Sequence, residues 1–262
     1  MDINPETWNY IGRYVGASLA LGLGGLGAAI GMGMAGAEAN RAMMKQPSKH
    51  SDLLRTMLLG QAVGGSPSIF ALVVGLLILF LPVNESTSGM VFASTLIGAG
   101  LAVGLGCFGS GVGCGFPAAQ ACSGVARNPK KSTALTSTMM IGQALAQSPS
   151  IFATIVALIL LFLPTPSVGI TSAGIAIAAG LSMGASALGP GLGSGITAGG
   201  AVKGQSDWPQ SRSITVRTMM IGQAICDTPA IFGMLVSFIM LFTLQDLEVS
   251  IIGFSKVMAA AI

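Results

Sequence analysis

The chain has 262 residues, of which 52% are hydrophobic and 8% are charged, and its mean hydropathy is +0.78. Soluble globular domains carry about 25% charged residues, so this composition excludes an ordinary soluble domain. The net charge of +3 gives no indication of a nucleic-acid partner. We therefore predict an integral membrane protein surrounded by lipid.

Uncharged stretches divide the chain into six predicted transmembrane helices. A helix needs about 20 mostly apolar residues to cross a bilayer, and here Gly- and Ala-rich stretches alternate with bulkier apolar runs. We predict an all-α fold in which each pair of stretches forms one helical hairpin. The predicted units are hairpins at 1–82, 83–164 and 165–244, followed by a C-terminal tail at 245–262.

Basic residues gather at alternate turns between the predicted helices. The second turn has only Glu85 and the fourth, 164–169, has no charge. By the positive-inside rule, the basic turns are predicted to be cytoplasmic and both chain ends to lie outside. The first ten residues lack a basic segment and an apolar core, so we expect no cleavable signal. We expect a multi-pass protein of a prokaryotic cell membrane. The basic residues are Arg41, Lys45, Lys49 and Arg55 at the first turn, Arg127, Lys130 and Lys131 at the third, and Lys203, Arg212 and Arg217 at the fifth.

Three copies of one unit follow each other along the chain. Gly60-Gln61-Ala62 recurs 82 residues later at 142–144 and a further 80 residues later at 222–224. The same offsets relate the turn prolines Pro47, Pro129 and Pro209. Agreement at fixed spacing indicates triplication. Because each copy holds two spans, the copies are parallel, which argues against a carrier built from inverted repeats and favours units side by side around an axis along the membrane normal.

The first helix of each copy has small residues on two flanks. Gly22, Gly24, Gly31 and Gly33 show the alternation in copy one, and residues two apart on a helix point about 200° apart. Two smooth flanks favour a ring of closely packed helices, although a dimer interface needs only one. We expect the bulkier second helices to form an outer, lipid-facing layer.

Two of the first helices contain a proline. We predict that Pro117 and Pro190 interrupt and bend these helices.

One acid lies deep in a predicted span. Asp227 lies five residues after the Gly of the third Gly-Gln-Ala block. The equivalent positions in the first two copies are Gly65 and Gln147. A carboxylate at that depth is costly and indicates function. The alternative is an Asp that merely hydrogen-bonds a neighbouring helix.

These features together carry a family resemblance. The glycine-alternating helix, the turns Lys45-Gln46-Pro47 and Arg127-Asn128-Pro129, and Gly-Gln-Ala followed by an acid and a Ser or Thr resemble the proteolipid rotor-ring subunits of rotary ATPases, known as the c or K type. The resemblance covers nearly the whole chain. It departs at Asp207-Trp208-Pro209, which puts the contact of that turn with the central stalk in question.

The resemblance implies specific roles. Asp227 is expected to bind the transported ion and to move past an essential arginine of a stator subunit, with Thr228 and Ser194 as its neighbours. Gly65 and Gln147 are expected to bind no ion. Implied partners are further copies of the chain in a homo-oligomeric ring and central-stalk subunits at the cytoplasmic turns. The chain itself is expected to be non-catalytic.

The transported ion is expected to be H⁺. Sodium-binding members of the family supply a Gln from the first helix, where this chain has Met32, Cys114 and Ser194, so Na⁺ at Asp227 is the less favoured choice. We expect no cofactor and no metal centre, since the four cysteines lack CxxC spacing and suit helix packing.

Three functions remain open at this point: a rotor-ring subunit, a static oligomeric pore, and a structural proteolipid. For a rotor, one acid per three hairpins predicts few ions per turn and a ring better suited to ATP-driven pumping than to synthesis.

Overall fold

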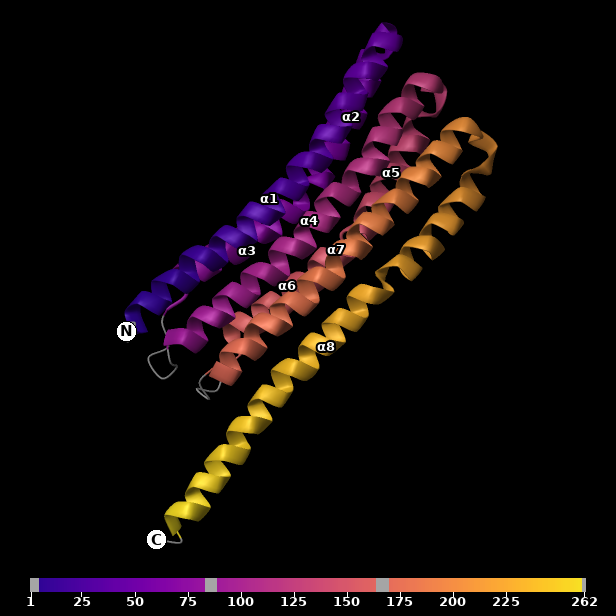
Figure 1. Ribbon diagram of the computed structural model, residues 1–262. Coiled ribbons are helices and arrows are strands. Elements are labelled where there is room, and N and C mark those ends of the chain that lie inside the picture. The colour runs from indigo at the N-terminus through magenta and orange to yellow at the C-terminus, as the bar shows by residue number, and fades with distance from the viewer. Residues whose placement is uncertain (1–4, 83–88, 164–169, 261–262) are drawn as a thin grey trace.

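The computed structural model describes residues 5–82, 89–163 and 170–260, and every element within these residues is helical. Figure 1 shows long helices running nearly side by side. Six stretches of the described chain are long and apolar enough to cross a membrane. The predicted second and fourth turns, with Glu85, lie outside the described residues. The helices are α1 (Pro5–Lys45), α2 (His50–Gly64), α3 (Ser66–Phe80), α4 (Gly89–Arg127), α5 (Ser132–Ala146), α6 (Ser148–Phe162), α7 (Ile170–Asp207) and α8 (Arg212–Ala260).

The helices form three tandem hairpins, as the repeat predicts. A long first helix (α1, α4 or α7) ends at a short 3₁₀ turn that begins with a proline, and the second helix follows at once. The three turns lie together at one end of the molecule, and α1 begins and α8 ends toward the opposite end (Figure 1). The turns are Pro47–Lys49, Pro129–Lys131 and Pro209–Ser211.

The first helices form an inner layer in which α4 lies between α1 and α7. Their backbones touch because glycines line both contacts. A Cβ atom added to Gly31 would lie 2.1 Å from the carbonyl oxygen of Gly111, and one added to Gly113 would lie 2.1 Å from that of Gly191. No side chain fits at such distances, so the predicted small flanks are what permit this packing.

The second helices form an outer layer over the junctions of the inner one. The second helix of hairpin 1 (α2 and α3) contacts α1 and α4, that of hairpin 2 (α5 and α6) contacts α4 and α7, and α8 packs on α7 and α6. Large apolar side chains such as Ile69, Ile155 and Phe232 are exposed on this layer. A lipid-facing outer layer is consistent with that exposure.

The two inner prolines do not interrupt their helices, contrary to the sequence-based prediction. Pro117 lies inside α4 and Pro190 inside α7, and both helices continue past them. The breaks occur instead in the outer layer at Gly65 and Gln147. In the inner layer both prolines are buried against their neighbours, and close packing holds each helix through the missing N–H donor.

The glutamine of each Gly-Gln-Ala block ties the two layers together. The Gln143 amide donates to the carbonyl of Cys114 on α4 at 2.9 Å and to that of Gly60 on α2 at 2.8 Å. Gln223 repeats the pattern one hairpin further, to Ser194 at 3.2 Å and Gly142 at 2.8 Å. In an apolar interior such bonds satisfy the amide N–H groups and fix the register of adjacent hairpins, while the buried Oε1 atoms of Gln143 and Gln223 have no hydrogen-bond partner among the described residues.

Candidate ion-binding site

Asp227 lies at the middle of the apolar span Pro209–Thr243 and is the only acid in that span. The α8 helix is continuous through it. The side chain is partly buried toward the neighbouring helices. A charged side chain at this depth has a high free-energy cost, so the groups around Asp227 determine whether it can bind and release an ion.

The nearest polar partner of Asp227 is Ser194. The Ser194 hydroxyl donates to Oδ1 of Asp227 at 2.8 Å, and Ser194 is fully buried on α7. Gln223 holds the backbone at this point by its bond to the Ser194 carbonyl. The structure thus brings together two of the three predicted site residues.

The hydroxyl of Thr228, the third predicted site residue, has a different partner. Its hydroxyl donates to the carbonyl of Ala224 within α8 at 3.5 Å. A second hydroxyl near the Asp227 carboxyl is that of Ser148, on α6 of the preceding hairpin, and it donates to the Leu145 carbonyl at 2.7 Å. Sequence reasoning missed Ser148, although it aligns with Thr228 in the repeat. The hydroxyl next to the acid therefore comes from the neighbouring copy, and the site is built from α6, α7 and α8 of two hairpins.

The equivalent positions in the first two hairpins have different chemistry. The Gln147 amide donates to the carbonyl of Val63 at 3.0 Å, which links α6 to the second helix of hairpin 1. Gly65 has no side chain, and an added Cβ would lie 3.5 Å from the sulfur of Met32. Neither position has an ionisable group, so Asp227 is the one ionisable group at this depth among the three.

The outer helix also differs between the copies at this depth. Gly65 and Gln147 have ψ angles of −16° and −11°, flatter than in an α-helix, and each is followed after one residue by a proline. α8 continues through Pro229 without a break. The outer helix that bears the acid is therefore the one whose hydrogen-bonding pattern is continuous at this point.

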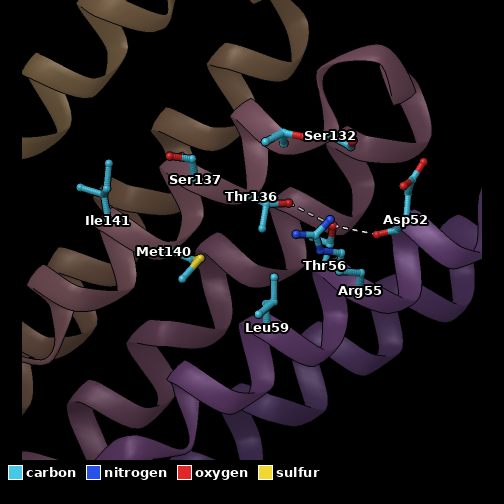
Figure 2. Close-up of a pocket in the computed structure, with 10 residues that line it drawn as sticks. Asp52, Arg55, Thr56, Leu59, Ser132, Thr136, Ser137, Met140 and Ile141 are labelled. Atoms are coloured by element: carbon cyan, nitrogen blue, oxygen red, sulfur yellow. Dashed lines mark hydrogen bonds between the residues drawn. The ribbon is translucent and has the colours of Figure 1, made fainter.

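A groove with a volume of about 420 Å³ lies nearer the 3₁₀ turns, between α2 and α5. Figure 2 shows Thr56 and Thr136 facing each other across it, and their hydroxyls hydrogen-bond at 3.1 Å. Asp52 and Arg55 lie at the polar end of the groove, and Leu59 at the apolar end. Asp227 is on α8 and does not belong to this groove.

Triplicated membrane hairpins with one acid in the middle of the last outer helix define a proteolipid. The comparisons with known proteins agree. The family model of the ATP synthase C subunit matches three times, at residues 15–78, 97–160 and 177–240, once in each hairpin. The chain therefore belongs to the ATP synthase C-subunit family.

Relatives of two sizes are similar to the chain. The K subunit of the A-type ATP synthase of Methanocaldococcus jannaschii is 29% identical over 88% of this chain and 96% of its own length. The ATP synthase c subunits of Alkaliphilus oremlandii and Petrotoga mobilis are 47% and 42% identical over 25% and 27% of this chain, each over 74% of its own length. The short relatives correspond to one hairpin, and the long one to the triplicated chain.

Proposed function

We propose that this chain is a non-catalytic, ion-translocating subunit of the rotor ring of a rotary ATPase, and that Asp227 binds the transported ion. The observation that supports this most directly is the single mid-span carboxyl held by Ser194 in a member of the ATP synthase C-subunit family. A binding site that must load and release an ion on every turn needs a group that changes charge. Asp227 is that group.

The transported ion in this proposal is H⁺. A proton needs only the carboxyl, with hydroxyl neighbours such as Ser194 and Ser148 to orient it. A sodium ion needs several oxygen ligands at once, and the Ser194 carbonyl already accepts from Gln223. Protection of Asp227 from a hydrophobic carbodiimide by millimolar Na⁺ at fixed pH would overturn the choice of H⁺.

The proposal includes a low gearing. Each chain has three hairpins but one carboxyl at the carrier depth, with Gly65 and Gln147 in the other two places. A homo-oligomeric ring of n chains then moves n ions per turn and, with a three-fold catalytic head, n/3 ions per ATP. Moving one charge against 100 mV costs about 2.3 kcal/mol, so fewer ions per ATP can each be driven up a steeper gradient. The ring is suited to ATP-driven pumping.

The partners in this proposal meet different parts of the chain. A stator arginine passes Asp227 within the membrane, and central-stalk subunits contact the 3₁₀ turns. We place these turns in the cytoplasm and both chain ends outside, in a prokaryotic cell membrane. The third turn exposes Trp208, and the adjacent Asp207 accepts a 2.7 Å hydrogen bond from Arg127, so it offers the stalk a neutralised acid beside an aromatic ring.

The substitution Asp227→Asn tests the function. In a rotor it abolishes ATP-driven ion uptake while the ring still assembles, because the amide keeps the size of the side chain but cannot titrate. A static pore would show only altered conductance, and a structural proteolipid would keep coupled transport. Gln147→Asn is the matched control, since it alters a side chain at the same depth without removing an ionisable group, and it should keep ion uptake.

A further inference from the structure

The two lateral faces of the chain are equivalent to faces that are paired inside it. α4 meets α1 on one side and α7 on the other, so each internal contact repeats the other one hairpin along. The outer flanks of α1 and α7 lack such a partner within the described chain. Gly33 on α1 and Gly189 on α7 are open there, whereas their equivalents Gly115 and Gly109 lie against a neighbouring backbone.

The open face of α7 is equivalent to the face of α4 that packs on α7, and the open face of α1 is equivalent to the face of α4 that packs on α1. The partner that fits both faces is therefore a second copy of this chain. We infer that, in the ring of the proposed function, α7 and α8 of one chain pack against α1 and α2 of the next, and that the outer layer of this seam matches the internal junctions while its inner layer is wider. The outer and inner layers are supported by separate observations.

In the outer layer, the glutamine bonds provide the match. Gln143 and Gln223 each bond one carbonyl of their own hairpin and one glycine carbonyl of the preceding hairpin. Gln61, their equivalent, makes only the bond to its own hairpin, to Met32 at 3.1 Å, among the described residues. The repeat places the carbonyl of Gly222 of the preceding chain where Gln61 can donate its second N–H.

In the inner layer, larger residues replace glycines. Inside the chain, a Cβ added to Gly100 would lie 2.2 Å from the Gly16 carbonyl oxygen, and one added to Gly180 would lie 2.1 Å from that of Gly98. At the seam the equivalent pair is Ser18 of one chain and Ala178 of the other.

A third position shows the same replacement. A Cβ added to Gly111 or to Gly191 would lie 2.5 Å from a backbone nitrogen of the neighbouring helix. The equivalent residue at the seam is Ala29. Ser18, Ala29 and Ala178 are all exposed in the single chain. Since ordinary contact of a Cβ begins near 3.4 Å, α1 and α7 at the seam must lie about 1 Å further apart than the helices inside the chain.

Charges at the ends of the first helices agree with this order of chains. Arg127 at the end of α4 pairs with Asp207 at the end of α7, one hairpin further. The equivalent neighbour of Asp207 across the seam is Lys45 of the next chain, an opposite charge. Within the chain the position equivalent to Asp207 is Arg127, a like charge that lines one pocket with Lys45 and Glu38. An exposed pair adds little stability, so this contact favours the register more than the affinity.

Two measurements on the purified ring test the seam. With the four native cysteines changed to alanine, which keeps each Cβ, the double variant Ser18→Cys/Ala178→Cys is treated with a short thiol cross-linker, and the two single-cysteine variants are the controls. The double variant should give a ladder of whole-chain multimers and the single variants none.

The second measurement is the temperature at which the ring dissociates. The triple variant Ser18→Gly/Ala29→Gly/Ala178→Gly should raise this temperature, because it removes the Cβ atoms that hold the inner helices apart at the seam. Ala62→Gly/Ala144→Gly, at exposed outer positions, should not.

The outcomes separate this inference from the proposed function. An intact ring without the cross-linked ladder, or a ring whose dissociation temperature is unchanged or lowered by the three glycines, would overturn the seam and leave the rotor function standing. A chain that remains single by native mass would overturn both. If the glycine variant fails to fold, the cross-linking result alone decides.

Discussion

Ser194 on α7 donates a 2.8 Å hydrogen bond to the carboxyl of Asp227 on α8, and both residues lie in the third hairpin. The other hydroxyl at the carboxyl, that of Ser148, comes from the second hairpin. All three belong to one chain. The groups that contact the Asp227 carboxyl within the described chain therefore come from one polypeptide, and α8, which bears the acid, is itself one of the helices at the proposed seam.

The first prediction separates the hydroxyls. Ser194→Ala should lower ATP-driven ion uptake in reconstituted vesicles at least about tenfold, since a hydrogen bond to a charged group contributes roughly 1.5–3 kcal/mol. Ser148→Ala should lower it less, because the Ser148 hydroxyl donates to the Leu145 carbonyl. Thr228→Ala should leave uptake nearly unchanged, because the Thr228 hydroxyl bonds within its own helix. The opposite ranking, with Thr228 essential and Ser148 dispensable, would show that the carboxyl turns toward Thr228 in the working ring.

The second prediction concerns the protonation of the carrier. A carboxylate facing hydrocarbon loses its hydration, so Asp227 should be neutral while it faces lipid. A hydrophobic carbodiimide, which reacts with protonated carboxyls, should then modify Asp227 near neutral pH. Peptide mass mapping of the labelled chain identifies the modified residue. Labelling confined to Glu38 or Glu85 would contradict this account of the site.

The third prediction builds a second site. Gln147→Asp combined with Cys114→Ser reproduces in hairpin 2 the acid and first-helix hydroxyl of hairpin 3, with Ser66 in the place of Ser148. The double variant should double the number of ions moved per turn. Cys114→Ser alone should leave it unchanged. The readout is the reversal potential of ATP-driven pumping, and an unaltered potential in the double variant would mean that the surroundings of Asp227 supply more than these two groups.

The fourth prediction concerns the inner layer. Gly113→Val should prevent α4 and α7 from meeting, because a Cβ there would lie 2.1 Å from the Gly191 carbonyl oxygen. Overpacking costs about 1–3 kcal/mol where a core can adjust, and a backbone contact adjusts poorly. Gly200→Ala is the control, since an added Cβ there meets nothing within 4 Å. Thermal unfolding in detergent should show a lower midpoint for the first variant only.

Much of the fold was predictable because the sequence repeats. The offsets of Gly60, Gly142 and Gly222 predict three parallel hairpins, and glycines on two flanks of each first helix predict a packed inner layer. The prediction that Pro117 and Pro190 interrupt their helices was wrong. Proline disfavours a helix locally, but close packing around α4 and α7 outweighs that preference.

The site was predictable only in part. Asp227 is evident as the one acid within its apolar span, and Ser194 follows from the pairing of helices inside a hairpin. Ser148 does not follow from its own hairpin, because the sequence does not say which second helix lies beside α8. Local order along the chain therefore favoured Thr228, the adjacent hydroxyl. Packing between hairpins determines which hydroxyl lies near the Asp227 carboxyl.

The central claim is that one carboxyl per three hairpins moves the ions. The most direct test is the thermodynamic ratio of ions to ATP in reconstituted vesicles, measured together with the number of chains in the same ring. For a ring of n chains we expect a ratio of n/3. A ratio near the number of hairpins divided by three would contradict it, because ions would then have to bind in the hairpins of Gly65 and Gln147 or on a second proteolipid in the ring.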